Sequence, residues 1–377
     1  GAVPAVARIV DGQRRPLAGL GARLVRAPAA GGIDLLLTID RRLQAAVDRI
    51  ADRSLPRGAI VVMSPWTGEI LALASRPSFD PRRPAAELRT PGAPFLNRAL
   101  TAYHPGSIFK LVVLAAALEK DPDVFMRLFE DPGRLACGHL TFHCPGGGHG
   151  LMTLADALAF SCNTVFIRLA LELGLTELVR TAERLGLGVP ACLDLPGEAL
   201  GCLPPAEDGS PGSLANTALG QGAVTVTPLQ VARMIGAVAN GGRLVGGRIL
   251  LGTADGKGRV RALAGGGAPV RVISARTARL MRIMMAGVIR YGTGRAAAVS
   301  MGAAGKTGTA QSGTEDPDGR RVNHAWFAGF APLSRPRYVV VVLAEGGGAG
   351  GAVAAPVFRQ VMETALGRTG TKEAKGT

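Results

Sequence analysis

Apolar and polar positions alternate with two different periods along this chain, and their order indicates its architecture. Residues 58–63 and 69–75 are short apolar runs, joined by a Ser-Pro-Trp-Thr-Gly segment that favours a tight turn. Three further strands, separated by turn-rich loops, are predicted near the C-terminal end, at residues 302–311, 323–331 and 338–344. Segments between the two groups have helical periodicity. The pattern predicts an α+β fold: a central antiparallel five-stranded sheet built from both chain ends and flanked by helices, with an inserted mainly helical subdomain.

From its sequence, the chain is predicted to have three parts. Residues 1–32 are rich in Gly, Pro, Ala and Arg without a clear period, and we interpret them as a linker or the remnant of an N-terminal module. One domain is predicted for residues 33–367, and we expect a mobile polar tail at 368–377. The domain opens with a strand at 33–40, and loops are predicted at residues 76–94, 131–150 and 187–213. Helices are predicted at residues 41–54, 107–118, 153–160, 164–173, 176–186, 228–239, 274–291 and 354–366.

Composition narrows the classes of function. The formal charge of +15 favours anionic surroundings such as nucleic acid, anionic lipid or acidic cell-wall polymers. The arginines are scattered and aromatic residues make up only 4% of the chain, so nucleic-acid binding is not indicated. No apolar run is long enough to span a membrane. The sequence does not begin with Met, which leaves open that an N-terminal anchor was cut away.

A candidate nucleophile stands where an apolar helix begins. Tyr103-His104-Pro105-Gly106 forms a predicted turn, and Ser107 and Lys110 follow at a spacing of three. On a helix this spacing puts both side chains on one face, so the amine can reach the hydroxyl. A desolvated lysine is one way to activate a serine, and the free N–H groups of a helix start suit an oxyanion.

Two further segments carry polar groups suited to the same chemistry. Ser161 and Asn163 lie at a helix–helix break, where they could relay a proton and hold a carbonyl, or simply cap a helix. Lys306-Thr307-Gly308-Thr309 lies on a predicted strand, where its ammonium and hydroxyls suit a carboxylate. Glycine in a strand often marks close approach of a ligand, and the Thr309 N–H can donate to an oxyanion.

Together, Ser107-x-x-Lys110, Ser161-x-Asn163 and Lys306-Thr307-Gly308 resemble the three-motif signature of serine penicillin-recognising enzymes. The surrounding sequence over roughly residues 33–367 resembles the transpeptidase domain of class B penicillin-binding proteins. The resemblance implies the penicillin-recognising serine enzyme fold and peptidoglycan D,D-transpeptidation of stem peptides ending in D-Ala-D-Ala. It favours the elongation-type branch over the division and sporulation types.

The resemblance also implies roles for these residues. Ser107 attacks the penultimate carbonyl with Lys110 as general base, while Ser161 and Lys306 pass a proton to the departing D-Ala. Asn163 orients the substrate amide, and Thr307, Gly308 and Thr309 belong to the strand that binds the terminal carboxylate. β-Lactam antibiotics are expected to acylate Ser107, and no cofactor is required for catalysis.

Members of this class are membrane-anchored and work beside a membrane-embedded glycan polymerase. The resemblance therefore implies a cell-membrane location, with the catalytic domain on the extracytoplasmic face.

The cysteines admit three interpretations. Cys137, Cys144, His149 and Cys162 could form a tetrahedral structural zinc site, and some members of the elongation-type branch carry metal ligands in this region. Outside the cell, Cys137–Cys144 and Cys192–Cys202 disulfides are the competing interpretation, and free thiols are the third.

Two rival functions share the serine–lysine chemistry. A β-lactamase or D,D-carboxypeptidase would pass the acyl group to water, but the chain has no Glu-x-x-Leu-Asn segment like that of class A β-lactamases. A non-catalytic β-lactam sensor domain is the other alternative. Rapid turnover of penicillin would favour the hydrolase, and transfer activity separates a transpeptidase from both.

Overall fold

The computed structural model describes residues 3–8, 22–27, 34–192, 194–205, 209–255, 258–263, 267–315 and 318–373. Two compact units are present, one formed by residues 38–249 and 266–377 and the other by residues 1–37 and 250–265. The larger unit contains the predicted five-stranded antiparallel sheet, in the order β14-β15-β16-β4-β5. Its strands are β4 (Gly58–Met63), β5 (Ile70–Arg76), β14 (Ala304–Glu315), β15 (Arg321–Ala331) and β16 (Tyr338–Ala344).

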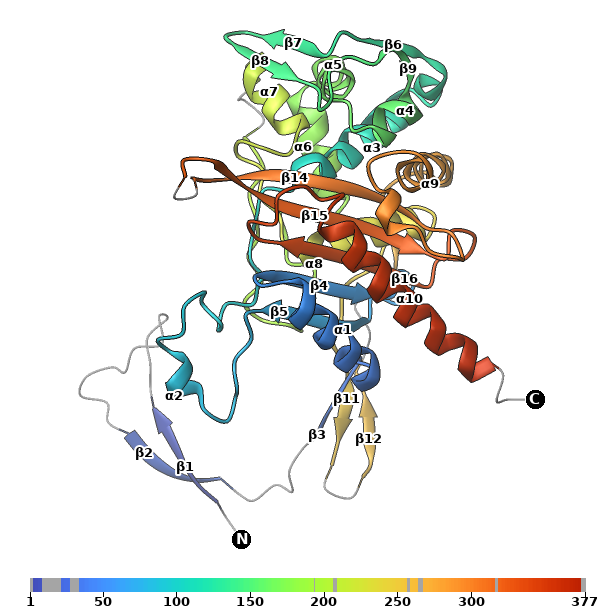
Figure 1. The fold of residues 1–377 in the computed structure, drawn as a ribbon. Helices are drawn as coiled ribbons and strands as arrows, with labels where there is room; N and C mark the ends of the chain where they lie inside the picture. The colour runs from blue at the N-terminus through green and yellow to red at the C-terminus, as the bar shows by residue number, and fades with distance from the viewer. Residues whose placement is uncertain are drawn as a thin grey trace. The chain divides into compact units, whose positions relative to one another are not determined.

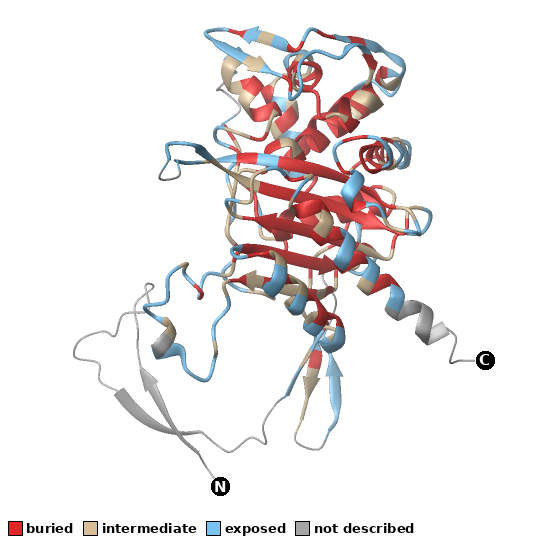
Figure 2. Cartoon of the chain, in the orientation of Figure 1, coloured by how far each residue is buried: buried red, intermediate tan, exposed pale blue. Residues whose placement is uncertain are grey.

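Helices cover both faces of this sheet, as Figure 1 shows. Every residue of β4 is buried, and successive side chains contribute to two separate apolar clusters. Val61 and Met63 belong to the cluster that includes α3 (Lys110–Lys120) and α8 (Pro228–Ala239). Ile60 and Val62 belong to the cluster that includes α1 (Arg41–Ser54) and α10 (Ala354–Glu373). The period of two therefore places the sheet between two helical layers, and the burial colours of Figure 2 follow this arrangement.

The helices of the larger unit agree in most places with the periodicity. Ser274 and Thr227 cap their helices as side-chain acceptors, the latter in a complete capping box with Gln230. The helices are α1 (Arg41–Ser54), α2 (Pro84–Glu87), α3 (Lys110–Lys120), α4 (Leu154–Ala159), α5 (Asn163–Leu173), α6 (Leu175–Arg184), α7 (Pro211–Ala218), α8 (Pro228–Ala239), α9 (Ala275–Arg290) and α10 (Ala354–Glu373), with 3₁₀ turns η1 (Gly106–Ile108), η2 (Val124–Met126) and η3 (Arg295–Ala297).

Several predictions about loops and ends were wrong. The region 131–150 contains a hairpin of β7 (Arg134–Cys137) and β8 (Leu140–His143), and β6 (Leu128–Asp131) pairs with β9 (Gly150–Thr153). Helix α2 lies within the predicted 76–94 loop, and α7 begins within the predicted 187–213 loop. Helix α10 continues to Glu373, so the predicted mobile tail is helical over 368–373, and residues 374–377 lie outside the described part.

The smaller unit combines residues 1–37 with residues 250–265. The region interpreted as a linker or the remnant of an N-terminal module contains an antiparallel pair, β1 (Val3–Arg8) and β2 (Ala22–Ala27). Strand β3 (Asp34–Leu37) joins β11 (Leu250–Ala254) and β12 (Val260–Ala262) in a separate three-stranded sheet. The larger unit has one further strand pair, β10 (Arg243–Leu244) with β13 (Val270–Arg271). None of the described helices is both long enough and apolar enough to cross a lipid bilayer.

Candidate active site

The candidate nucleophile, Ser107, lies in the 3₁₀ turn η1, which leads directly into α3. Gly106 has a φ of +55°, and a Cβ atom there would lie 2.5 Å from the Thr309 carbonyl oxygen of β14. Only glycine fits this position without strain. On the other side, the Gly106 N–H donates to the Gly220 carbonyl at 3.1 Å. The turn that presents Ser107 is therefore held between β14 and the segment after α7.

Lys110 is the first residue of α3, and its side chain is fully buried. Its ammonium donates to the Ser161 carbonyl at 2.7 Å, to Asn163 Oδ1 at 2.7 Å and to Ser161 Oγ at 3.2 Å. The spacing indicates that this amine can reach the Ser107 hydroxyl, but its hydrogen bonds among the described residues go to Ser161 and Asn163. Burial lowers the pKa of Lys110 to about 7, so a large fraction of this amine is neutral at physiological pH.

Ser161 connects α4 to α5 in a conformation rarely adopted by residues other than glycine. Its φ is +58°, and the Cys162 N–H donates back to the Ala157 carbonyl at 2.8 Å, which closes the end of α4. A non-glycine residue in this conformation costs about 1–3 kcal/mol. The strained turn directs the Ser161 hydroxyl toward two lysines, which explains why a serine occupies a position that favours glycine.

The second of these lysines, Lys306, comes from β14 and is also fully buried. Its ammonium donates to Ser161 Oγ at 2.9 Å and to the Thr307 carbonyl at 3.0 Å. Burial, reinforced by the positive charge of Lys110, holds the pKa of Lys306 well below its ordinary value. Because Lys110 and Lys306 bind one hydroxyl, the three groups form a continuous path for a proton.

Asn163 completes the second motif at the N-terminus of α5. Its Oδ1 atom accepts from Lys110, and its Nδ2 atom donates to the His143 carbonyl of β8 at 2.6 Å. The strand pair that the sequence did not predict thus fixes the orientation of the Asn163 amide.

Strand β14 passes close to the Ser107 turn because Gly308 has no side chain. A Cβ atom at Gly308 would lie 2.9 Å from both the Pro105 carbonyl oxygen and the Trp326 Cβ atom. The Trp326 indole, fully buried on β15, donates to the His104 carbonyl at 3.1 Å. These contacts bring the Thr309 backbone beside Ser107, as an oxyanion site requires.

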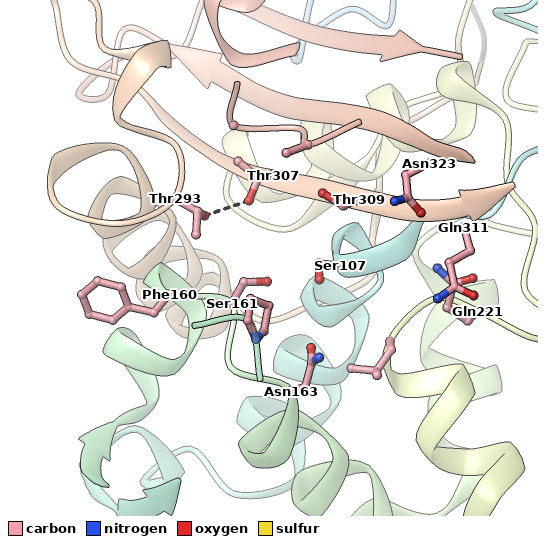
Figure 3. Close-up of a pocket in the computed structure, with 14 residues that line it drawn as sticks. Ser107, Phe160, Ser161, Asn163, Gln221, Thr293, Thr307, Thr309, Gln311 and Asn323 are labelled. Atoms are coloured by element: carbon pink, nitrogen blue, oxygen red, sulfur yellow. Dashed lines mark hydrogen bonds between the residues drawn. The ribbon is translucent and has the colours of Figure 1, made fainter. Parts of the chain in front are cut away.

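The three motifs meet at a pocket of about 570 Å³. Figure 3 shows Ser107 near its centre, with Thr293 and Thr307 to one side and Gln221, Gln311 and Asn323 to the other. None of its lining residues is ionisable; they are Ser107, Pro145, Phe160, Ser161, Asn163, Leu219, Gln221, Thr293, Thr307, Thr309, Gln311, Asn323, Ala349 and Gly351. The charged groups of the motifs, Lys110 and Lys306, lie buried beneath this surface.

The sequence did not single out Thr293. Its Oγ1 atom lies 2.8 Å from Thr307 Oγ1, and its backbone N–H donates to the Ala159 carbonyl at 3.0 Å. In the sequence, the only available sign of Thr293 was its position between Gly292 and Gly294, directly after the helix predicted at residues 274–291. The amides at the opposite end of the pocket were not given a role either. Gln311 and Asn323 face each other on β14 and β15, and Gln221 lies in the segment after α7.

A candidate metal site lies behind the second motif. Ligand atoms of Asp131, Cys144 and Cys162, all buried, lie within 4.8 Å of one another, and His149 Nδ1 is 2.7 Å from Asp131 Oδ2. Contact with the Cys162 thiol, together with N–H groups of Thr164 and Asn163, lowers the pKa of Cys144 to about 6 despite its burial. A carboxylate and two thiols with a histidine at hand are a donor set that fits zinc.

The structure rearranges the predicted ligand set. Cys144 and Cys162 belong to the cluster and His149 contacts it through Asp131, but Cys137 is outside it and Asp131 supplies the third ligand atom. All five cysteines are free thiols, so neither predicted disulfide is formed. The Sγ atoms of Cys144 and Cys162 are 3.4 Å apart.

Comparison with known proteins agrees with this geometry. Residues 58–363 match the penicillin binding protein transpeptidase domain. The chain belongs to the penicillin-binding protein transpeptidase family. Stage V sporulation protein D of Bacillus subtilis is 36% identical over 369 residues, which cover 92% of this chain and 56% of that protein. The chain thus spans only about half the length of that relative.

Solved structures of transpeptidase domains have the same fold. The D,D-transpeptidase domain of a peptidoglycan glycosyltransferase from Eggerthella lenta has a TM-score of 0.81 and 29% identity, and the match covers 97% of this chain and 96% of that one. A ceftriaxone acyl-enzyme complex of penicillin-binding protein A from Mycobacterium tuberculosis also has a TM-score of 0.81 and 29% identity, covering 89% and 80% of the two chains. The predicted fold class is confirmed.

Proposed function

We propose that this chain is a peptidoglycan D,D-transpeptidase, which crosslinks stem peptides ending in D-Ala-D-Ala through an acyl-enzyme on Ser107. The observation that carries the proposal is the double hydrogen bonding of Ser161 Oγ, by Lys110 and Lys306, beneath the pocket that Ser107 lines. A serine hydroxyl needs a neighbouring base, and a lysine with a pKa of about 7 can serve as one. The names of the relatives support the same activity, since several are peptidoglycan D,D-transpeptidases.

In the acylation step that we propose, each motif has one role. The donor carboxylate binds the hydroxyls of Thr307 and Thr309, which line the pocket together with Thr293. Ser107 attacks the penultimate carbonyl and gives its proton to neutral Lys110, while the N–H groups of Ser107 and Thr309 stabilise the oxyanion.

The proton then leaves along the two lysines. Lys110 returns it through the Ser161 hydroxyl and Lys306 to the nitrogen of the departing D-Ala, whose peptide bond breaks. An amine from a neighbouring stem attacks the ester carbonyl, forms the new amide and restores the Ser107 hydroxyl. A β-lactam enters the same sequence as an acyl donor, and opening of its ring leaves an ester on Ser107.

The proposal is tested by mass spectrometry of the intact chain after incubation with benzylpenicillin. One adduct is expected, mapped to Ser107, lost in Ser107→Ala and retained in the control Ser300→Ala, whose residue is exposed. Formation of a crosslinked product from glycan-linked stem peptides then identifies transfer. Rapid release of hydrolysed penicillin without crosslinked product would instead support the hydrolase alternative.

We also propose that Asp131, Cys144 and Cys162, with His149, hold a structural zinc ion. The metal would tie the β6–β9 region to the start of α5, where Cys162 stands between Ser161 and Asn163. When bound, zinc would supply fixed geometry and charge neutralisation for the thiolates. The chemistry of acylation remains with the serine and lysines.

We further propose that the chain acts on the extracytoplasmic face of the cell membrane, beside a membrane-embedded glycan polymerase. The support is the proposed substrate, because peptidoglycan strands are polymerised and crosslinked outside the membrane. Fluorescent penicillin labelling of intact cells, followed by crosslinking to the neighbouring polymerase, tests both parts. The relatives of this chain include a protein named for sporulation and one named MrdA, so their names do not select one branch. Membership of the elongation-type branch stays a prediction.

A further inference from the structure

One end of the catalytic pocket is closed by an aromatic ring that has no role in the mechanism above. Phe160 directly precedes Ser161, and Figure 3 shows its ring at the same end of the pocket as Thr293 and Thr307. Among the described residues that line the pocket, it is the only aromatic one. The hydroxyls of Thr293 and Thr307 lie 2.8 Å apart. This end of the pocket therefore combines hydroxyl groups with one large apolar surface.

Two neighbouring rings hold Phe160 in place. The His149 ring stacks on it, with ring centres 5.5 Å apart and planes at 21°, and Tyr291 makes a tilted contact at 5.9 Å. Each neighbour is tied to a carboxylate. His149 Nδ1 lies 2.7 Å from Asp131 Oδ2, and the Tyr291 hydroxyl donates to Asp156 Oδ1 at 3.1 Å. Because such ring contacts are favourable, Phe160 presents a fixed apolar wall to the pocket.

Under the proposed function, on which this assignment rests, the departing and the incoming amine use one position in the pocket. The nitrogen of the departing D-Ala takes its proton from the path through Ser161 and Lys306, and its carboxylate binds Thr307. Resolution of the acyl-enzyme is the same displacement in reverse with another amine, so the incoming nitrogen occupies the same place and loses its proton to the same path. The carbon chain on that nitrogen therefore lies at the end of the pocket that Phe160 closes.

We propose that Phe160 is a specificity-determining residue for the acceptor. Its ring packs against the carbon chain next to the attacking amine, and so selects acceptors whose chain is apolar at this point. Burial of apolar surface should favour transfer about fourfold for each methylene that the ring covers. A charged group at this place would lose water without gaining a partner, because none of the described lining residues is ionisable.

Partition of one acyl-enzyme between water and a series of amines tests the proposal. The donor is an N-acyl-D-alanyl thioester, whose departing thiol does not compete as an amine acceptor. The acceptors are glycine, D-alanine, D-2-aminobutyrate and D-norvaline, which share an amine and a carboxylate and differ by one methylene at each step. Each amine breaks the Ser107 ester and forms an amide. The ratio of transfer to hydrolysis is measured by chromatography, and it does not depend on the rate of acylation.

For the wild-type chain, we expect this ratio to rise about fourfold at each of the first two added methylenes. Phe160→Ala should abolish the rise, whereas Phe160→Leu, which keeps an apolar side chain, should retain part of it. Tyr291→Ala removes one of the rings that hold Phe160 and should reduce the rise. The control Phe95→Ala, at an exposed phenylalanine outside the pocket lining, should keep the wild-type series. If Phe160→Ala does not fold, Phe160→Leu and Tyr291→Ala decide the outcome.

Other outcomes would overturn the inference. An equal fall in transfer to every acceptor in Phe160→Ala would mean that the ring only supports the Ser161 turn. A wild-type ratio that stays constant along the series would exclude selection by the ring and leave the proposed transpeptidase intact, because transfer still occurs. Hydrolysis alone in the presence of every acceptor would support the hydrolase alternative and overturn both proposals. Absence of an acyl-enzyme on Ser107 would count against the transpeptidase, and the acceptor role of Phe160 would fall with it.

Discussion

The Nζ atom of Lys306 lies 2.9 Å from the Oγ atom of Ser161, so groups 145 residues apart in the sequence share one hydrogen bond. On its other side, the same hydroxyl accepts from Lys110 at 3.2 Å. Removal of this oxygen should interrupt the proton path without displacing the nucleophile. We expect Ser161→Ala to slow acylation by a chromogenic cephalosporin roughly 10²- to 10⁴-fold, measured by stopped flow. An unchanged rate would exclude the relay, and the exposed Ser300→Ala variant serves as the control.

The acylation rate should depend on the charge of Lys110. Burial lowers the pKa of this residue to about 7, and only the neutral amine accepts a proton from Ser107. The rate constant should therefore rise with pH and reach half of its plateau near pH 7. Lys110→Met should lose this dependence together with nearly all activity, while Lys120→Ala, at the far end of α3, should keep the wild-type profile. A midpoint above pH 9 would contradict the role of Lys110 as base.

The close approach of β14 to the Ser107 turn predicts sensitivity at Gly308. A methyl group there would lie 2.9 Å from the Pro105 carbonyl oxygen, so strand and turn must separate. Displacement of catalytic groups by about 1 Å typically costs on the order of 100-fold in rate, and we expect Gly308→Ala to slow acylation by that factor. Gly209→Ala is the control because its added methyl group would meet no atom within 4 Å. Equal rates in the two variants would show that the packing is not required.

Metal analysis distinguishes the ligand set seen in the structure from the one predicted by cysteine and histidine spacing. We expect one zinc per chain, lost in Asp131→Asn and retained in Cys137→Ser. The reason is that Asp131, and not Cys137, is grouped with Cys144 and Cys162. Chelation should also lower the melting temperature of the wild-type chain, since a structural metal contributes to folding. The opposite result, with zinc lost from Cys137→Ser alone, would support the zinc ligands predicted from the sequence.

The five-stranded sheet was predictable mainly because its inner strands β4, β15 and β16 are largely buried and appear as apolar runs, whereas the outer strands β5 and β14 are partly exposed. The strand pairs near the candidate metal site were not predictable, because β7 and β8 are mostly exposed and lie among glycines. Asp131 had a weak signal: in Leu128–Asp131 exposed and buried positions alternate, which directs Phe129 and Asp131 inward. A carboxylate on the buried face of a strand would have suggested a ligand.

The motifs selected residues that the structure brings together at one pocket, and their catalytic roles stay a proposal, but the contacts between them were not predictable. The spacing put Lys110 within reach of Ser107 but gave no sign that the ammonium is held by the carbonyl and hydroxyl of Ser161 and by Asn163. That arrangement depends on the left-handed backbone of Ser161, which no local pattern indicates. Helix α10 continued past its predicted end through Gly367 and Gly370, residues that weaken helices without always ending them.

The order of strands in the sheet has a consequence for biosynthesis. Strands β4 and β5 are synthesised before β16, which pairs with β4, and most of the helices lie between them in the sequence. The nucleophile is therefore synthesised long before Lys306 and Thr309 reach it, and a nascent chain that stops short of β14 has no oxyanion donor from that strand. Penicillin should consequently not label a nascent chain until β14 has been made, so the drug cannot capture the protein at earlier stages of translation.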